Sequence, residues 1–200
     1  DLNDNSIKVF DDDFKIATSF SFSEKNRIKW LSNFKKVSQD KKLTIYELEN
    51  HKIKIIRKVT TFNNQIRIDD RYINKTNQNL GVINNYKFLE YLPVEVEISG
   101  RKFEKSNQIL AENPTILMND SQTSFGLYLN DEFSKINSEI KINKKNEVSI
   151  YNDNLIIKPK NEYIKSFSIF KFDKLISYYD FINYLRREME VYSYIDGNLL

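Results

Sequence analysis

The chain contains no cysteine, one histidine, three prolines and four glycines among its 200 residues. The lack of cysteine excludes disulfide bonds and thiolate metal sites. The glycines are scattered at positions 81, 100, 126 and 197, so no glycine-rich loop is available to cradle a phosphate group. A single histidine also leaves no histidine cluster for binding a metal. We therefore expect neither a cofactor nor a bound metal ion.

The chain also has no large excess of positive or negative charge. The 31 Lys and Arg residues nearly balance the 28 Asp and Glu residues, and the two signs are interleaved along the chain. A nucleic-acid-binding protein usually carries a basic block or stripe, and no apolar run approaches the ~20 residues that span a bilayer. We expect neither nucleic acid nor a membrane as a partner. The lack of cysteine does not fix the compartment, and a secreted or cell-surface bacterial location is favoured.

Most of the chain consists of short runs of β-branched and aromatic residues separated by polar turns. In residues 94–100, for example, Val94, Val96 and Ile98 alternate with polar residues, so one face of that strand should be buried. The turn spacings are typical of antiparallel hairpins and predict a mostly β fold, an antiparallel β-sandwich, rather than a parallel α/β fold. The predicted strands are 6–10, 14–22, 42–50, 52–60, 65–76, 80–92, 94–100, 115–119, 124–130, 138–143, 147–151, 155–159 and 162–172.

Two segments are less regular. In residues 27–37, RIKWLSNFKKV, the apolar residues recur every three positions. That spacing permits a short helix, with a strand and a loop as the alternative. Residues 101–113 are expected to form a long loop.

The end of the chain differs from the rest, because its apolar residues fall at helical spacing. Asp173 is expected to cap this helix. Arg186 and Arg187 lie on its other faces, and arginine is favoured at interfaces, where its planar group pairs with carboxylates. We expect the helix to contact a neighbouring domain through an apolar stripe made of Leu175, Tyr178, Ile182, Leu185 and Met189.

Residues 53–82, IKIIRKVTTFNNQIRIDDRYINKTNQNLGV, resemble a known family. One strand carries Arg57, the next strand ends with Asp70 in an Ile-x-Ile-x-Asp pattern, and an Asn-Lys-Thr element precedes a strand that opens Leu-Gly-Val. This order resembles the β-supersandwich of galactose-mutarotase-like domains, which recurs as an accessory domain in carbohydrate-active enzymes. The terminal YYDFINYLRREMEV looks like the linker helix that joins such a sandwich to a catalytic (β/α)-barrel in glycoside-hydrolase-like proteins. The resemblance covers residues 43–200.

The resemblance implies a domain organisation and a function. We expect a sandwich over residues 1–172, in which 1–42 is alternatively a separate N-terminal extension, and a linker over 173–200 toward a further domain. The implied function is a non-catalytic accessory domain of a carbohydrate-active, glycoside-hydrolase-like protein, supporting an adjacent catalytic domain in the same polypeptide. The alternative is a free-standing carbohydrate-binding module that uses exposed aromatic side chains.

A self-sufficient mutarotase or lyase is disfavoured. Mutarotases use a catalytic histidine and glutamate, whereas the only histidine here, His51, falls at a strand-to-strand turn and does not match that position. Asp69 and Asp70 are adjacent on a strand and should point to opposite faces, so they cannot flank one glycosidic bond. We expect Asp70 to form a structural ion pair with Arg57. The run of acids at residues 11–13 is expected to be a solvated turn rather than a calcium site.

Carbohydrate remains a candidate partner. Sugar binding requires aromatic faces that stack on the ring and amide groups that fix its hydroxyls. Aromatic residues of a sandwich serve packing more often than binding, which is the competing interpretation. The sugar-binding candidates are Trp30, Asn84, Asn85, Tyr86, Phe88 and Tyr91.

Overall fold

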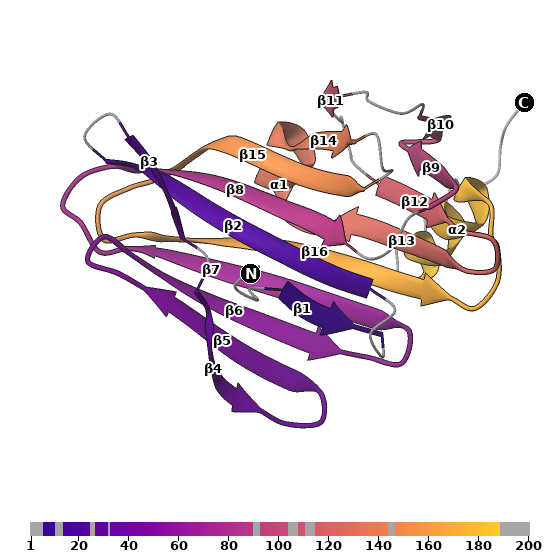
Figure 1. Ribbon diagram of the computed structural model, residues 1–200, viewed down its shortest axis with the longest axis horizontal. Coiled ribbons are helices and arrows are strands. Elements are labelled where there is room, and N and C mark those ends of the chain that lie inside the picture. Colours follow the sequence, from indigo (N-terminus) through magenta and orange to yellow (C-terminus); the bar gives the residue numbers. More distant parts are fainter. Residues whose placement is uncertain are drawn as a thin grey trace, which may run out of the picture.

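The computed structural model describes residues 6–10, 14–24, 27–31, 33–89, 93–103, 108–110, 115–143 and 147–188. Within these residues the chain forms two antiparallel sheets that pack face to face, together with two helices (Figure 1). The predicted β-sandwich with a C-terminal helix is confirmed. None of the described helices is long and apolar enough to cross a membrane.

The smaller sheet has seven strands, in the order β1-β2-β8-β15-β14-β11, and β3 also pairs with β2. The larger sheet has nine, in the order β10-β9-β12-β13-β16-β7-β6-β5-β4. The smaller sheet contains β1 (Ser6–Val9), β2 (Phe14–Glu24), β3 (Arg27–Leu31), β8 (Leu80–Leu89), β11 (Gln108–Leu110), β14 (Glu139–Ile142) and β15 (Val148–Ile157). The larger sheet contains β4 (Lys35–Gln39), β5 (Leu43–Glu49), β6 (Ile53–Thr61), β7 (Gln65–Asn74), β9 (Glu95–Ile98), β10 (Arg101–Lys102), β12 (Thr115–Asn119), β13 (Ser124–Leu129) and β16 (Glu162–Phe172).

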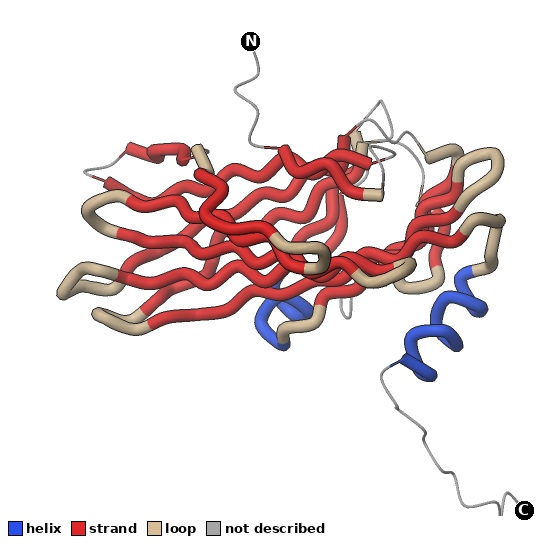
Figure 2. Tube along the Cα trace, turned by 90° about the horizontal axis from the view of Figure 1, so that it is seen from below, coloured by secondary structure: helices blue, strands red, loops and turns tan. Residues whose placement is uncertain are grey.

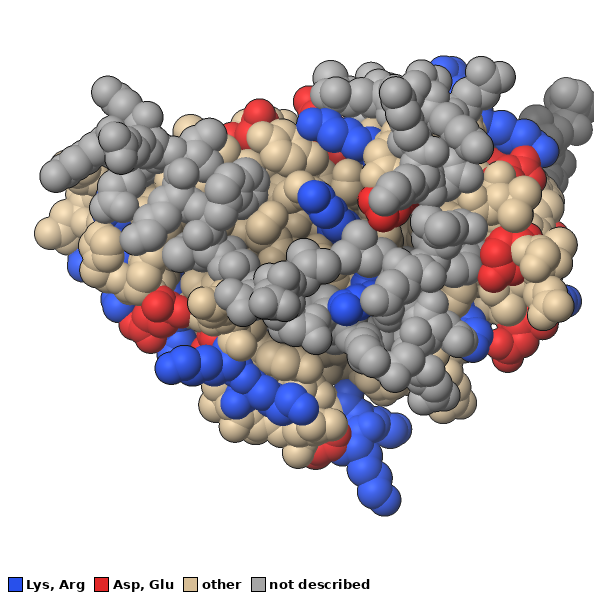
Figure 3. Space-filling model, in the orientation of Figure 1, with Lys and Arg blue, Asp and Glu red and all other residues tan. Residues whose placement is uncertain are grey.

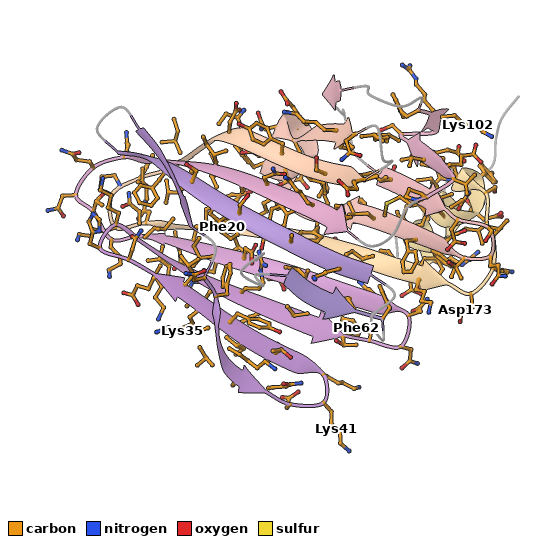
Figure 4. All side chains as sticks on the ribbon, in the orientation of Figure 1. Phe20, Lys35, Lys41, Phe62, Lys102 and Asp173 are labelled. Atoms are coloured by element: carbon orange, nitrogen blue, oxygen red, sulfur yellow. The ribbon has the colours of Figure 1, made fainter. Side chains whose placement is uncertain are left out.

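The core lies between the two sheets and is built by alternation along each strand. On β6, Ile53, Ile55 and Val59 are buried while their sequence neighbours are more exposed. Phe20 on β2 points into the same interior (Figure 4). Each apolar side chain removed from water contributes roughly 1.5–3 kcal/mol, so this alternation fixes which face of each sheet turns inward.

One edge of the larger sheet, formed by β4, carries charged side chains that protect it from pairing with another strand. The edge strand β4 is exposed along its whole length. It begins with Lys35 and Lys36, and the turn to β5 carries Lys41 and Lys42, all exposed. Lysine side chains gather along this edge in Figure 3, and Lys35 and Lys41 project from it in Figure 4. Lysine on an edge strand disfavours pairing with a second sheet, so the sequence of β4 keeps this edge unpaired.

The C-terminal helix α2 (Tyr178–Glu188) packs against the outer face of the larger sheet. Its buried residues Phe181 and Leu185 contact Leu117 and Phe170. Gly126 on β13 makes room for the helix, because a Cβ atom at that position would overlap the Phe181 ring. Of the stripe expected on this helix, Tyr178, Ile182 and Leu185 pack against the chain's own sheet, whereas Leu175 is exposed and precedes the helix. The most buried helix residue, Phe181, was not part of the expected stripe.

The cap of α2 differs from the expectation. The Ser177 hydroxyl accepts a hydrogen bond of 3.2 Å from the Asp180 backbone N–H, and the Asp180 carboxylate accepts one of 3.2 Å from the Ser177 backbone N–H. This reciprocal pair is a capping box, so the prediction that Asp173 caps the helix is wrong. Asp173 lies in an exposed turn just after β16 (Figure 4).

Of the two alternatives for residues 27–37, the strand is the one observed, because most of the described residues there belong to β3 and to the start of β4. Three further expectations need correction. The expected loop 101–113 contains β10 and β11. The two strands expected in 147–159 are one strand, β15, with a bulge between Asn152 and Leu155. The short helix α1 (Glu132–Asn137) was not expected. The predicted turn at 11–13 and Met189 lie outside the described residues.

Candidate functional site

A charged pair lies inside the sandwich. Arg57 on β6 and Asp70 on β7 are opposite each other in register, and both side chains are 1 % exposed. The Arg57 Nε and Nη2 atoms donate hydrogen bonds of 2.7 Å to the two Asp70 oxygens. The Nη1 atom donates to the Thr18 hydroxyl on the opposite sheet at 2.7 Å. The ion pair therefore ties the two sheets together through the core.

Aromatic rings seal this pair from solvent. The Tyr86 hydroxyl donates to Asp70 at 2.5 Å, and it lies 2.9 Å from the Tyr72 hydroxyl. The Phe34 ring stacks 4.6 Å from the Arg57 guanidinium carbon. Burial by itself lowers the pKa of Arg57, but the adjacent Asp70 carboxylate outweighs this effect and raises that pKa above its ordinary value. Burial likewise raises the pKa of Tyr72 and Tyr86 well above 10. These groups link the two sheets inside the core, and their burial closes them to a ligand.

The sugar-binding candidates on β8 do not face solvent. Asn84, Tyr86 and Phe88 point into the core, and Tyr86 and Phe88 both pack edge-to-face on Phe167. Stacking of Tyr86 or Phe88 on a sugar is therefore excluded, because β8 is a central strand whose inward face meets the other sheet. Asn85 is half-buried on the opposite face of β8.

The remaining candidates are not tested by this arrangement. Trp30 belongs to β3, but the structure does not describe its side chain. Tyr91 lies outside the described residues. His51 is exposed in the turn between β5 and β6. Arg186 and Arg187 are exposed on α2, so they stay candidates for a domain interface.

A cluster of polar side chains lies on the outer face of the larger sheet. Tyr128, Ser168 and Arg67 are aligned in register across β13, β16 and β7, and Ser166 and Asp69 pair in the neighbouring row. We call these residues, with Gln65 and Asn130, the polar strip. Both helices lie on one side of the strands in Figure 2.

One helix contacts a residue of the polar strip, and the other contacts the residue that precedes it. The Lys135 ammonium of α1 lies 5.4 Å from the Tyr128 ring centre, and the α2 residue Tyr184 accepts a 3.1 Å hydrogen bond from Asn64, which precedes Gln65. The strip therefore occupies the sheet surface between α1 and α2.

Hydrogen bonds hold the polar strip in one arrangement. The Asn130 amide donates to the Ser166 and Ser168 hydroxyls at 3.0 and 3.1 Å. Asp69 accepts from the Ser166 hydroxyl at 2.5 Å and from Arg67 Nε at 3.0 Å. Amide, hydroxyl, carboxylate and guanidinium groups beside an aromatic ring can together recognise a ligand rich in hydroxyl groups.

The polar strip was missed in the sequence because its members come from three strands and a loop. One signal was available: in β16 Ser166 and Ser168 alternate with Lys165 and Phe167, so two small hydroxyl residues share the outer face. No three His, Cys, Asp or Glu side chains in the described part are grouped so that they could hold a metal ion.

Comparison with known proteins shows the class of fold. No family model matches this sequence. No curated protein sequence matches it either. Solved structures do match, and they include galactose mutarotase-like proteins and glycoside hydrolases. The fold of this chain is therefore that of the galactose mutarotase-like β-sandwich, and the prediction made from residues 53–82 is confirmed.

Three solved structures illustrate the match. A galactose mutarotase related enzyme from Lactobacillus acidophilus is 10% identical with a TM-score of 0.55, covering 78% of this chain and 79% of that one. A galactose mutarotase-like protein from Lactobacillus casei is 5% identical with a TM-score of 0.56, covering 79% and 85%. The GH36 α-galactosidase AgaA from Geobacillus stearothermophilus is 8% identical with a TM-score of 0.53, covering 79% of this chain but 30% of that one. At these identities the likeness shows the fold alone.

Proposed function

We propose that this chain is a non-catalytic accessory domain of a carbohydrate-active protein and that it supports an adjacent catalytic domain in the same polypeptide. In this proposal residues 1–172 are the sandwich and 173–200 are the connector. The match to a minor part of a much longer α-galactosidase supports this role, because a similar sandwich there is one portion of a larger enzyme.

The observation that carries the proposal is the placement of α2. Its apolar side is anchored on the sheet through Phe181 and Leu185. Its other side presents Tyr179, which is 70% exposed, together with Arg186 and Arg187. Tyrosine and arginine are the residues most enriched at the centres of interfaces. A helix fixed to one domain with such a surface outward suits contact with a second domain.

The test is activity of the chain alone. Optical rotation of freshly dissolved α-D-galactose should relax at the spontaneous rate in the presence of the purified chain. A faster relaxation that is lost in His51→Ala would overturn the proposal, because the chain would then be an enzyme by itself. The coding sequence after Leu200 provides a second check: alternating strands and helices with acids at strand ends are expected there.

Carbohydrate binding is the second candidate function, and the polar strip is the observation that favours it. The strip replaces the buried residues of β8 as the place where a sugar would bind. Tyr128 would supply the stacking face, and Asp69 and Arg67 would bind hydroxyl groups. The nonpolar C–H face of a sugar ring and its ring of hydroxyls match such a combination.

Calorimetric titration and thermal shift against a panel of oligosaccharides test this candidate. A ligand that binds only the folded chain raises the melting temperature by mass action. Arg67→Ala should abolish that rise, whereas Lys41→Ala, an exposed change in the turn between β4 and β5, should leave it intact. A rise that survives Arg67→Ala would exclude the polar strip as the binding site.

A further inference from the structure

Three polar residues form a row on the inner face of the smaller sheet. Asn84 on β8 is the register partner of Asn152 on β15. Glu139 on β14 pairs with Tyr151, so the preceding residue Ser138 falls beside Asn152. All three side chains are no more than 1 % exposed. Ser138, Asn152 and Asn84, which we call the polar row, therefore line the interior where apolar side chains would be expected.

Each member of the polar row has a polar atom without a partner. The Asn84 Nδ2 donor, the Asn152 Oδ1 acceptor and the Ser138 hydroxyl are buried and make no hydrogen bond. A buried polar group left unpaired costs about 1–3 kcal/mol, and nearly all such groups in folded proteins find a partner, from protein or from water. Three unpaired atoms in one row thus point to a missing common partner.

The amide orientations are fixed by the bonds that the row does make. Asn84 Oδ1 accepts a hydrogen bond of 2.5 Å from the Lys165 ammonium, so its Nδ2 must face elsewhere. Asn152 Nδ2 donates to the Asn137 carbonyl oxygen at 2.8 Å, so its Oδ1 is the free atom. Rotating either amide would break these bonds, so Asn84 Nδ2 and Asn152 Oδ1 are the atoms left without a partner.

Lys165 adds further donors at the same place. It reaches the row from β16 on the opposite sheet and is 2 % exposed. An ammonium group has three N–H donors, and Asn84 accepts one of them while the Tyr86 ring lies 4.8 Å away. Burial lowers the pKa of Lys165 to about 8, against the opposing attraction of Asp131 and Asp70.

We propose that the polar row and Lys165 together form a binding site for ordered water. The missing partner must accept hydrogen bonds from Asn84 Nδ2 and Lys165 and must also donate to Asn152 Oδ1. An anion without a hydroxyl group, such as chloride, cannot donate, and a metal cation would be repelled by the Lys165 ammonium. Water does both, and a buried water typically makes about three hydrogen bonds of this kind.

The consequence is a hydrated polar centre within the sandwich, separate from the sealed pair of Arg57 and Asp70. Water accepting from the ammonium replaces part of the hydration that Lys165 loses on burial. It also links β8, β15 and β16, which belong to different sheets. The site is independent of the proposed function, because it lies inside the fold and concerns neither sugar nor a second domain.

The test uses the wild-type protein. A high-resolution crystal structure should show water within hydrogen-bonding distance of both Asn84 Nδ2 and Asn152 Oδ1. In solution, the Asn84 side-chain amide protons should show a nuclear Overhauser effect to a long-lived water. A direct hydrogen bond between Asn84 and Asn152 with no water density would overturn the proposal, and so would the absence of the Overhauser effect.

Two matched variants locate the site. Asn152→Leu should abolish the Overhauser effect at Asn84 and lower the melting temperature by about 2–4 °C, the shift expected for the loss of roughly one hydrogen-bonding interaction in a chain of this size. Ile156→Ala, at an exposed position on the same strand, should change neither. An Overhauser effect that persists unchanged in Asn152→Leu would show that the water lies elsewhere and would refute the proposed site.

Discussion

Arg57 and Asp70 form a two-pronged ion pair between the sheets, with both hydrogen bonds at 2.7 Å and neither side chain accessible to solvent. The Thr18 hydroxyl accepts a hydrogen bond from Arg57, and the Tyr86 hydroxyl donates one to Asp70. A buried pair whose remaining hydrogen-bonding positions are filled is costly to break from one side.

Removing one partner should therefore be severe. Asp70→Asn leaves the Arg57 charge buried without a carboxylate and should lower the free energy of unfolding by about 3–5 kcal/mol, measured by urea denaturation. The matched control is Asp69→Asn, one residue along β7 but on the outer face, which should cost about 1 kcal/mol or less because its pair with Arg67 is partly exposed. Equal losses in the two variants would contradict a special role for the buried pair.

Gly126 controls how closely α2 approaches the sheet. Gly126→Ala places a methyl group against the Phe181 ring, so the helix must shift or detach. We expect a loss of about 1–3 kcal/mol, as for other overpacked sites, and faster amide exchange in α2. Gly81→Ala is the control, since a Cβ there meets no atom within 4 Å. Unchanged exchange in α2 would show that the helix does not depend on this contact.

The sequence was informative where burial follows a period of two. In β6 and β7 the alternation of Ile53, Ile55, Ile66 and Ile68 predicted the inward face, and Arg57 and Asp70 could be placed on it because they share that phase. Alternation assigns a face to each residue, and it therefore predicts pairs between neighbouring strands.

Alternation does not say what lies above each face. Tyr86 and Phe88 were candidates for sugar binding, but both are buried. The other sheet packs on their face of β8, and the local sequence pattern of a strand does not show how two sheets stack. The polar strip was missed for the same reason, since Tyr128, Asn130 and Ser166 meet only after β13 and β16 pair. Ser177 followed three residues later by Asp180 is the sequence signal of the observed capping box, whereas Asp173 lies too early in the chain to cap α2.

Asp131 should matter more than an ordinary helix cap. Its Oδ1 accepts from the Ser134 backbone N–H at 2.8 Å and from the Tyr163 hydroxyl, and its Oδ2 accepts from the Ser166 backbone N–H at 3.0 Å. The Asp131 charge adds to burial in raising the pKa of Tyr163.

Asp131→Ala should thus cost more than the ~1 kcal/mol of a typical cap, because a backbone donor and a hydroxyl on β16 lose their partner together. Thermal unfolding measures the loss. Asp173→Ala, in an exposed turn, is the control and should leave the melting temperature within about 1 °C. A loss no larger than the control would show that Asp131 is dispensable.

Lys165 should make stability rise with pH above neutrality. Its pKa is lowered from 10.5 to about 8 by burial, so between these values the unfolded chain binds a proton that the folded chain has released. Stability increases with pH wherever the unfolded state binds more protons, and the gain between pH 8 and pH 10 is at most about 2 kcal/mol. Above pH 10 the raised pKa values of Tyr72 and Tyr86 act in the opposite direction, because the unfolded chain then loses tyrosine protons first.

The measurement is the urea midpoint of the wild type and of Lys165→Met across that interval. Asp70, Asp131 and the Tyr86 ring face Lys165, and only the lysine is removed in the variant. The difference in unfolding free energy between the two proteins should shift in favour of the wild type as the pH rises from 8 to 10 and should be constant below pH 7. A difference that stays constant from pH 7 to pH 10 would mean that Lys165 keeps its ordinary pKa inside the sandwich.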